Sequence, residues 1–325
     1  MKMALKSKFI YKMKRTIFSL FLLSTLLSSC NSPLDRKIYC FDSLMEIRLN
    51  EGTKEDLDNI EKIFTTYDKL SDNYKARDIN NIYSINQSNE EIKIDEKLYN
   101  LLKISAEVPH FGANNFSFLC GSLAKKWKES LQDKVVLNNE IIAKELSKIQ
   151  TSEIIFKENN IVQRIGEAEI DLGAIAKGYT LDKIKEYLDS KQYSKYLISA
   201  GFSSILLGEK DSDDGLYSIG IKNTDYYFKA KNCFVSTSGI LEQSETIDGI
   251  TYSHIVNPNT GSAISNYDTV LVISGSGYIG DALSTSFMMA SVDEIKEVEK
   301  QVSIKVAAIK DKKIVYKSDS FEVFQ

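Results

Sequence analysis

The sequence is poor in the residues that build metal clusters, disulfide frameworks and rigid linkers. Its 325 residues include 2 histidines, 4 cysteines, 3 prolines and 1 tryptophan. There is no Cys-x-x-Cys pair and no cysteine–histidine spacing typical of a zinc site, so neither a zinc site nor a disulfide framework is predicted. The scarcity of proline also excludes a long proline-rich linker. We expect the cysteines after the N-terminal segment to be buried structural thiols.

The charge balance excludes another class of partner. The chain carries 41 lysines and arginines against 45 acidic residues, a net charge of −4. Proteins that bind nucleic acid usually show a basic face, whereas lysines and acids are interleaved along this chain. Nucleic acid is therefore not an expected partner. The apolar content of 43% and the charged content of 26% are typical of a folded soluble protein.

The first thirty residues have the pattern of an export signal. A basic stretch at residues 8–15 is followed by an apolar run at residues 17–27, and small residues then lead to Cys30. The apolar run is short for a membrane span, and the whole pattern predicts a secretory signal peptide. The sequence up to Cys30 resembles the lipobox of bacterial lipoproteins, in which the cysteine is lipidated and becomes the first residue. The alternative is a plain signal peptide with an incidental cysteine.

These features predict three parts of the chain. Residues 1–30 form the lipoprotein signal peptide, residues 31–37 a tether, and residues 38–325 the folded domain. We expect an exported protein, held by lipid on the inner membrane and facing the periplasm. Met13 is an alternative start, since a positive segment would still precede the apolar run.

The hydrophobic pattern of residues 38–325 predicts an α+β fold with mixed strands and helices. No Gly-x-Gly-x-x-Gly follows a predicted strand and the elements do not form a regular βαβ series, which argues against a Rossmann fold. Helices are predicted at Glu55–Tyr67, Lys97–Glu107, Asn138–Ile149, Ile175–Leu188, Asp281–Ala290 and Val292–Gln301. Strands are predicted at Glu153–Phe156, Ile161–Ile165, Glu169–Leu172, Tyr196–Ser199, Ser204–Leu207, Tyr217–Ile221, Cys233–Thr237, His254–Val256, Lys305–Ile309 and Lys313–Lys317.

The first segment with chemical potential runs from Asp171 to Tyr179. A predicted strand ends in an acid, small residues follow, and a helix begins near Lys177. The small residues let the backbone approach a ligand closely, and the free N–H groups of a helix start favour anions such as pyrophosphate. A purely structural loop is an equally good interpretation of this segment alone.

The second segment runs from His254 to Gly261 and places a histidine before an Asn-Pro-x-Thr-Gly turn. A histidine side chain ordinarily titrates near neutral pH, so His254 can accept a hydroxyl proton, although a lone histidine is more often structural.

The third segment holds Asp281 and Thr285, which share one helix face at a spacing of i, i+4. A carboxylate and a hydroxyl suit a hard cation such as Mg²⁺. The alternative is that Asp281 caps the helix and Thr285 bonds a backbone carbonyl.

Taken together, these segments resemble the ApbE-type family of FAD:protein FMN transferases. The segment from Asp171 to Gly178 is similar to the family's D-L-G-G-I-A-K-G, residues 236–239 to its T-S-G strand end, residues 254–261 to its H-I-x-x-P-x-T-G, and residues 281–285 to its D-A-x-x-T. The resemblance covers residues 38–325 and implies an ApbE-like, T-fold-like catalytic domain.

The resemblance implies roles for individual residues. Asp281 and Thr285 are the implied side-chain ligands of Mg²⁺, with the main-chain carbonyl of Ala174 as a third, and His254 is the implied general base. The implied FAD contacts are Asp171, Lys177, Ile255, Asn73, Ser117 and Leu119. Ser71 lies beside Asn73, where the N-terminal half of the family reaches the flavin.

Several positions depart from the family pattern. Ser117 and Leu119 stand where a family D-x-T segment has Asp and Thr, and Phe202 follows Gly201 where the family has a second glycine. Residues 240–242 replace a more usual Asp-Tyr-Glu, and residues 41–43 match a family M-G-T segment poorly. These departures affect segments that are implied to contact FAD. They do not affect the implied side-chain ligands of the metal.

The implied activity is Mg²⁺-dependent transfer of FMN from FAD to a threonine of an acceptor flavoprotein, with release of AMP. The alternatives are an FAD pyrophosphatase, which gives FMN and AMP, and a lipoprotein that binds FAD without turnover. A nicotinamide-dependent oxidoreductase is less favoured, because the dinucleotide fingerprint is absent. Residues 248–251 faintly resemble an acceptor motif, but a hairpin turn is the simpler interpretation.

Overall fold

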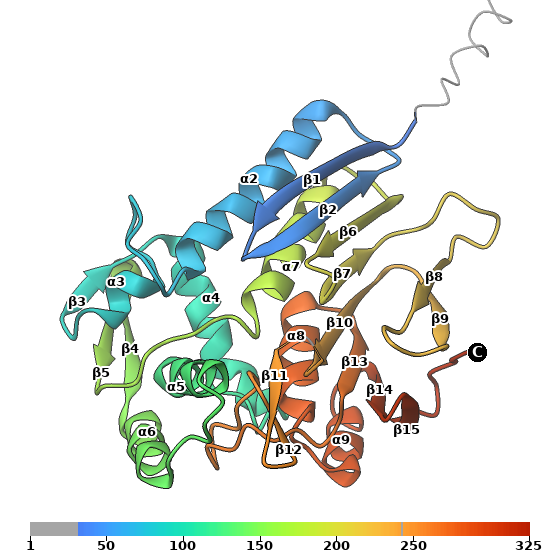
Figure 1. Cartoon of the computed structure of the whole chain (residues 1–325). Coiled ribbons are helices and arrows are strands. Elements are labelled where there is room, and N and C mark those ends of the chain that lie inside the picture. The colour runs from blue at the N-terminus through green and yellow to red at the C-terminus, as the bar shows by residue number, and fades with distance from the viewer. Residues whose placement is uncertain (1–31, 242) are drawn as a thin grey trace, which may run out of the picture. The chain divides into compact units, whose positions relative to one another are not determined.

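A large antiparallel sheet organises the folded part of the chain (Figure 1). The computed structural model describes residues 32–241 and 243–325, and residues 34–325 form one compact unit. The sheet has eight strands in the order β1-β2-β6-β7-β10-β13-β14-β15, each antiparallel to its neighbours. They are β1 Leu34–Cys40, β2 Ser43–Leu49, β6 Tyr196–Ala200, β7 Ser204–Leu207, β10 Cys233–Gly239, β13 Thr269–Ser274, β14 Ile304–Lys310 and β15 Lys313–Lys317.

Two different layers cover this sheet. Helices α2 (Lys54–Ser71), α7 (Ala176–Ser190) and α8 (Gly277–Phe287) pack on one face, and α9 (Val292–Glu299) follows α8. Successive side chains of a strand point to opposite faces, and Leu206 accordingly packs with the helices while Leu207 packs on the other side. That other side is covered by the hairpin of β8 (Tyr217–Gly220) and β9 (Tyr227–Ala230).

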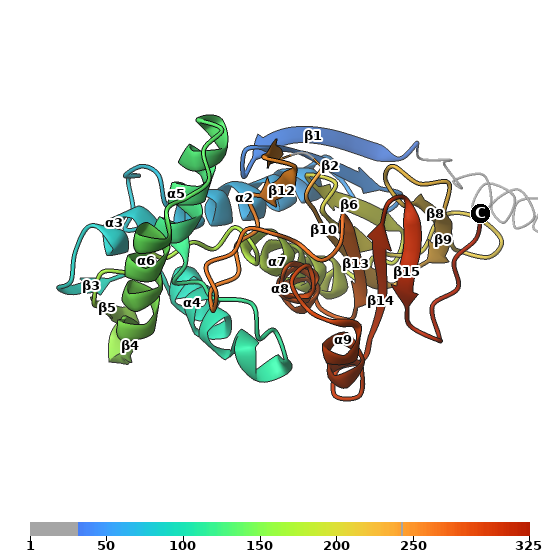
Figure 2. The ribbon, with the colours of Figure 1, turned by 60° about the horizontal axis from the view of Figure 1, so that its bottom comes forward.

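A second group of elements lies beside the large sheet (Figure 2). It contains α3 (Ile82–Asn86), α4 (Glu96–Glu107), η1 (Val108–Phe111), α5 (Gly121–Gln132) and α6 (Asn139–Thr151). A small sheet in the order β3-β5-β4 completes it, with β3 Glu91–Lys93, β4 Glu153–Lys157, η2 Glu158–Asn160 and β5 Ile161–Ile165. The remaining hairpin, β11 (Ser244–Ile247) and β12 (Ile250–Ser253), contacts α5, where the Tyr252 ring stacks on Trp127.

Most predicted elements are present, and local chemistry explains their ends. Asn138 caps α6 by accepting a hydrogen bond from the Glu140 N–H, as its position before the helix predicts. The final hairpin turns on Asp311 and Lys312, which both adopt positive φ. The α-helices and strands that were not predicted are α3, α5, β1, β2, β3, β9, β11, β12 and β13. Cys40 is a buried free thiol, as predicted, whereas the free thiols of Cys120 and Cys233 are only partly buried.

Three predicted elements differ from the structure. Residues 169–172 form no strand, because the Asn86 side chain bonds both the N–H and the C=O of Ile170 and takes the place of a neighbouring strand. Residues 254–256 also form no strand, since β12 ends at Ser253 and the chain bends there. Helix α8 begins at Gly277, before the predicted start, because Asp182 of α7 accepts hydrogen bonds from the N–H groups of Gly277 and Tyr278.

The N-terminal predictions fall largely outside the described residues. The signal peptide and the lipidation residue Cys30 lie there. The predicted tether is too long, because Leu34–Lys37 already pair with β2 as the first part of β1. Within residues 32–325 as described, no helix is both long and apolar enough to cross a membrane.

Candidate active site

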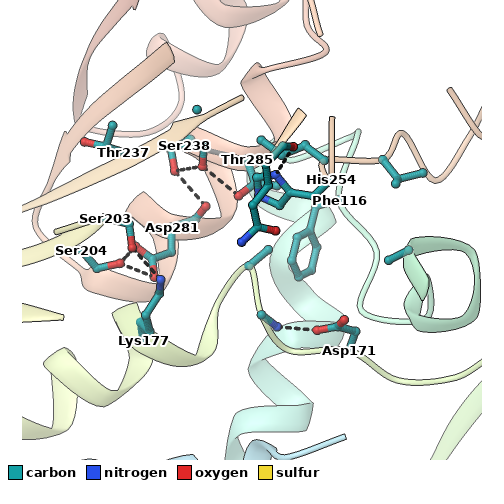
Figure 3. A pocket seen from close by; sticks show the side chains of 18 of the residues that line it. Phe116, Asp171, Lys177, Ser203, Ser204, Thr237, Ser238, His254, Asp281 and Thr285 are labelled. Atoms are coloured by element: carbon teal, nitrogen blue, oxygen red, sulfur yellow. Dashed lines mark hydrogen bonds between the residues drawn. The ribbon is translucent and has the colours of Figure 1, made fainter. Parts of the chain in front are cut away.

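The main cavity opens where the sheet, the helix layer and the second group of elements meet. Its volume is about 370 Å³. Six chain segments supply most of its walls: the loop before α5, the loop before α7, the turn between β6 and β7, the end of β10, the turn after β12, and α8. Eight of the predicted site residues line it, and they are Ser117, Asp171, Ala174, Lys177, His254, Ile255, Asp281 and Thr285. Figure 3 shows most of them, with Asp281, Lys177 and Thr285 close together.

Asp281 lies in α8 on the side that faces the sheet. Its carboxylate accepts hydrogen bonds from the N–H of Gly178 at 2.7 Å, from Ser236 Oγ at 2.6 Å and from Ser204 Oγ at 2.8 and 2.9 Å. Ser204 and Ser236 are register partners on β7 and β10, so both hydroxyls point to the helix face of the sheet. The alternative of Asp281 as a helix cap is wrong, because it lies in the second turn of α8.

Burial dominates the electrostatics of Asp281. The residue is 6% exposed, and burial raises the pKa of its carboxyl above the ordinary value. The hydrogen bonds from the serines and the charge of Lys177 oppose this shift only in part. A buried carboxylate of this kind is poorly balanced without a cation.

Thr285 follows Asp281 by one helical turn and completes the polar face of α8. Its hydroxyl lies 3.0 Å from Ser238 Oγ, which also lies 2.9 Å from Ser284 Oγ. Ser238 stands two residues after Ser236 on β10, so the alternation of a strand directs both to α8. The oxygen donors of Asp281, Thr285 and the cavity-lining Ala174 are the type that Mg²⁺ prefers. Among the described residues, no group of three or more acidic, histidine or cysteine side chains is placed to hold a metal ion.

Helices α7 and α8 cross at unusually short range, and two glycines make this possible. A Cβ on Gly178 would lie 2.2 Å from the Gly277 carbonyl oxygen, and a Cβ on Gly277 would meet the Gly178 oxygen at the same distance. The close crossing brings the Gly178 N–H to the carboxylate of Asp281. Gly178 therefore places the first turn of α7 against the acidic centre of the site.

The loop before α7 is shaped by its own acid. Asp171 accepts a hydrogen bond from the Gly173 N–H at 2.7 Å, which closes a tight turn. Lys177, in the first turn of α7, donates to Ser203 Oγ at 2.6 Å. Asp171, Gly173 and Lys177 also line a second cavity of about 490 Å³, so this loop forms a wall shared by both cavities.

Asn73 lies in the second cavity and not in the first. It is buried, and its Nδ2 has no hydrogen-bond partner among the described residues. Unpaired buried donors are uncommon and usually meet a ligand or water. Ser71 lines the same cavity, although its hydroxyl bonds the Tyr67 carbonyl. One residue that lines the second cavity thus has a buried amide nitrogen without a partner among the described residues.

The two departures before α5 have different consequences. Ser117 lines the main cavity, and its Oγ accepts a hydrogen bond from the Leu119 N–H at 3.1 Å. The hydroxyl therefore makes the local turn contact that an aspartate carboxylate at this position would also make. Leu119 instead packs in the hydrophobic core and lines neither cavity. The structure does not bring the Leu119 side chain to the site.

His254 follows β12 and projects into the main cavity. Its Nδ1 lies 3.2 Å from the Gln243 carbonyl oxygen. A carbonyl oxygen only accepts hydrogen bonds, so the ring donates from Nδ1 in this contact. Ile255 is buried beside it and lines the cavity.

The turn after His254 is anchored by residues that the sequence patterns do not single out. Trp127 of α5 donates its indole N–H to the Gly261 carbonyl at 2.8 Å. The Asn257 side chain donates to Asn115 Oδ1 at 3.1 Å, and the Asn115 N–H donates to Ser286 Oγ of α8. This chain of bonds links the histidine turn to the helix of Asp281 and Thr285.

The missed residues are mainly the serines around Asp281 and Thr285. Their one sequence signal is the alternation Ser236-Thr237-Ser238 within a strand, which places two hydroxyls on the helix face. Ser203 and Ser204 follow Gly201 and Phe202, the position noted above as a departure from the family's Gly-Gly, and the sequence assigned neither serine a role. Pairing of β7 with β10 is what brings Ser204 beside Ser236.

Comparison with known proteins identifies the kind of molecule that this fold and cavity represent. The solved structures of the ApbE protein from Thermotoga maritima and of the flavin transferase ApbE from Vibrio cholerae superpose with TM-scores of 0.72 and 0.71. Sequence identity is 22% and 21%, coverage of this chain 85% and 90%, and coverage of those chains 94% and 96%. These likenesses confirm the predicted mixed fold, which is neither a Rossmann fold nor a closed barrel.

The sequence comparisons carry the assignment further. The FAD:protein FMN transferase of Klebsiella pneumoniae is 26% identical over 276 residues, which are 81% of each chain. A protein of the same description from Treponema pallidum is 25% identical over 217 residues, 60% of each chain. The model of the ApbE family matches residues 36–309. The chain belongs to the ApbE family, and the prediction of a transferase is confirmed.

Proposed function

We propose that this protein is a Mg²⁺-dependent FAD:protein FMN transferase, which joins the FMN half of FAD to a threonine of an acceptor flavoprotein and releases AMP. The observation that carries the proposal is the buried carboxylate of Asp281, which lies beside the Thr285 hydroxyl at the wall of a cavity. Such a centre suits a cation that is completed by substrate phosphates. The description of the relatives as FAD:protein FMN transferases supports the same conclusion.

Asp281, Thr285 and the Ala174 carbonyl would hold the Mg²⁺. When bound, the ion would neutralise the charge of the pyrophosphate. Burial without a cation leaves the carboxyl of Asp281 with a raised pKa, and Ser204, Ser236 and the Gly178 N–H hold it in one orientation. These contacts restrict the carboxylate to a single geometry before any ligand binds, which is the property that a catalytic centre requires.

FAD fits the arrangement of the two cavities. It has two ring systems joined by a pyrophosphate, and the two cavities share the wall formed by Asp171, Gly173 and Lys177. Lys177 supplies a positive charge at this wall, and Asn73 supplies an unpaired donor in the second cavity. We propose that the pyrophosphate lies at the shared wall, with FAD contacts from Asp171, Lys177, Ile255, Asn73 and Ser117.

The residues of the cavity support phosphoryl transfer. In the proposed step, the acceptor threonine oxygen forms a bond to the phosphorus on the FMN side. The bond between that phosphorus and the bridging oxygen breaks, and AMP leaves with the electron pair. The hydroxyl proton passes to Nε2 of His254 and then to solvent. If water replaces the threonine, the same step gives free FMN and AMP.

We further propose that the enzyme acts outside the cytoplasm, anchored by lipid at Cys30 and facing the periplasm. The support is the sequence of residues 8–30, which combines a basic stretch, a short apolar run and a lipobox-like end. Labelling with a palmitate analogue would test it. We expect label on the wild-type chain and none on Cys30→Ser, and label on both would contradict the anchor.

The activity is tested with the detergent-solubilised full chain, FAD, Mg²⁺ and peptides that contain one threonine. Mass spectrometry follows the peptide, and chromatography follows FAD, FMN and AMP. We expect a peptide to gain the mass of FMN with release of AMP, and this gain to be lost with EDTA. Free FMN and AMP with unmodified peptides would instead define a pyrophosphatase. Intact FAD under all conditions would contradict both enzymatic functions and leave an FAD-binding lipoprotein.

A further inference from the structure

Phe202 is an exposed aromatic residue with an unfavourable backbone conformation. Its side chain is 63% exposed and its φ is +61°. Residues with a Cβ rarely adopt this left-handed region, and bulky ones are notable exceptions. Burial of the ring does not offset the cost of this backbone conformation, because the ring stays largely in solvent. Strained and exposed residues of this kind tend to occur at functional sites.

The turn that carries Phe202 is held firmly on both sides. It connects β6 to β7 through Gly201, Phe202 and Ser203. The Gly201 N–H donates to the Leu44 carbonyl, and the Thr237 N–H donates to the Ser203 carbonyl at 2.7 Å. A Cβ at Gly201 would lie 2.7 Å from the Ser43 Cβ, so the turn is also closely packed. The ring of Phe202 is therefore presented by a fixed backbone.

The position of Phe202 is at the rim of the main cavity. Its chain neighbours Gly201 and Ser203 line the cavity, whereas Phe202 itself does not. Leu241, which is 53% exposed, lies in the same way between the lining residues Gly239 and Gln243. The Thr237–Ser203 hydrogen bond connects the two strand ends. Two exposed apolar side chains thus flank walls that are made largely of serines and threonine.

We propose that Phe202 is a docking contact for the acceptor polypeptide and selects threonines that have an apolar neighbour. This inference rests on the proposed transferase function. The acceptor hydroxyl must enter the cavity, so the residues around that threonine meet the rim. FAD occupies the interior, which Phe202 does not line. A rigid aromatic side chain gives much contact area at little cost in conformational entropy, which favours such residues in protein recognition.

The test compares Phe202→Gly with the wild-type full chain. Glycine adopts positive φ freely, so this variant is expected to fold at least as stably, and its melting temperature would show it. The probes are peptides with one central threonine, flanked by apolar residues in one set and by polar residues in the other. We expect Phe202→Gly to raise KM for the apolar-flanked peptides by at least about tenfold. KM for FAD and the rate of FAD hydrolysis by water stay unchanged.

Two further variants control for backbone and ring effects. Lys312→Gly changes a residue of equal φ (+61°) in the β14–β15 turn and should leave all rates unchanged. Phe202→Tyr keeps an aromatic ring and should retain most of the wild-type KM for peptide. Equal use of both peptide sets by the wild type, or an effect of Phe202→Gly on KM for FAD, would overturn the docking role alone. If the wild type flavinylates no peptide, the proposed transferase function fails and the inference fails with it.

Discussion

Asp281 and Asp56 are two buried carboxylates in the helix layer of the same sheet, and their environments act in opposite directions. Asp56 is 3% exposed at the start of α2, and Asp281 is 6% exposed in α8. Both accept hydrogen bonds from hydroxyl groups and from a backbone N–H. Yet the pKa of Asp56 falls to about 2, while the pKa of Asp281 rises above its ordinary value.

The difference lies in the depth of each carboxyl as well as in its hydrogen bonds: Asp281 is enclosed by protein on all sides, whereas Asp56 lies near the surface, so the desolvation that its donors must offset is smaller. At Asp56, burial raises the pKa, but donors on Tyr187, Thr53 and Tyr193 outweigh it. At Asp281, the donors Ser236, Ser204 and Gly178 and the charge of Lys177 do not. The charged carboxylate of Asp56 is therefore stabilised by hydrogen bonds within the protein, and these bonds join α2 to the end of α7. At Asp281 the charged carboxylate stays unfavourable, because its hydrogen bonds do not fully offset its burial. A bound cation would offset the rest, and this is expected of a carboxylate that binds a ligand.

The strongest test of this comparison is Asp281→Asn. We expect transfer activity to fall on the order of 10³-fold, because the carboxylate that would hold the cation is lost. Stability in EDTA should stay the same or increase, since the variant removes a buried charge whose hydrogen bonds and nearby Lys177 offset its burial only in part. Thermal unfolding with and without Mg²⁺ and FAD measures both effects. A large loss of stability in EDTA would contradict the claim that the charged Asp281 carboxylate is unfavourable in the metal-free protein.

Gly178→Ala tests the helix crossing that supports the site. The new Cβ would lie 2.2 Å from the Gly277 carbonyl oxygen, so α7 and α8 must separate. Overpacking of this kind costs about 1–3 kcal/mol, and we expect a loss near the upper end in the free energy of unfolding from urea titration. Activity should fall with it, because the Gly178 N–H moves away from Asp281. Gly220→Ala is a matched control, since a Cβ at Gly220 would meet no other atom within 4 Å.

Asp56→Asn tests the opposite member of the pair. A folded-state pKa of about 2 against an ordinary value of 3.8 corresponds to about 2 kcal/mol of stability at neutral pH. Because the folded pKa is lowered, this contribution is complete above about pH 4 and is lost as the pH falls toward 2. We expect the variant to lose most of it at pH 7 and to show a flatter stability profile between pH 4 and 2. Transfer activity should not change at a temperature where the variant is folded.

The smallest expected effect is that of Tyr193→Phe. This variant removes one of the donors to Asp56, a hydrogen bond of 3.1 Å. We expect a loss of about 1 kcal/mol and a pKa of Asp56 that moves back toward its ordinary value, both measurable by urea titration and by NMR. A pKa that stays near 2 would show that Tyr187 and Thr53 suffice to hold the charge.

Local sequence rules predicted a large part of this molecule. Asn138 caps its helix, the β7 and β15 bounds agree with the hydrophobic pattern, and the resemblance of the motifs to the ApbE family is confirmed. Two of the errors share one cause. Residues 169–172 look like a strand but are held by Asn86, which is far away in sequence, and α8 starts early because Asp182 of another helix caps it. Residues distant in sequence thus supplied the bonds that a local pattern attributes to neighbours.

The sequence by itself determined the positions of the acid, the hydroxyl and the histidine, because short motifs fix residue type and spacing. It also determined that Asp281 and Thr285 share a helix face, since the helical period sets that relation. Only the tertiary structure decided that Ser204 and Ser236 surround Asp281, that Gly178 lies against Gly277, and that Leu119 points into the core. Strand pairing and helix crossing create these contacts between segments far apart in the chain, and no local pattern encodes them.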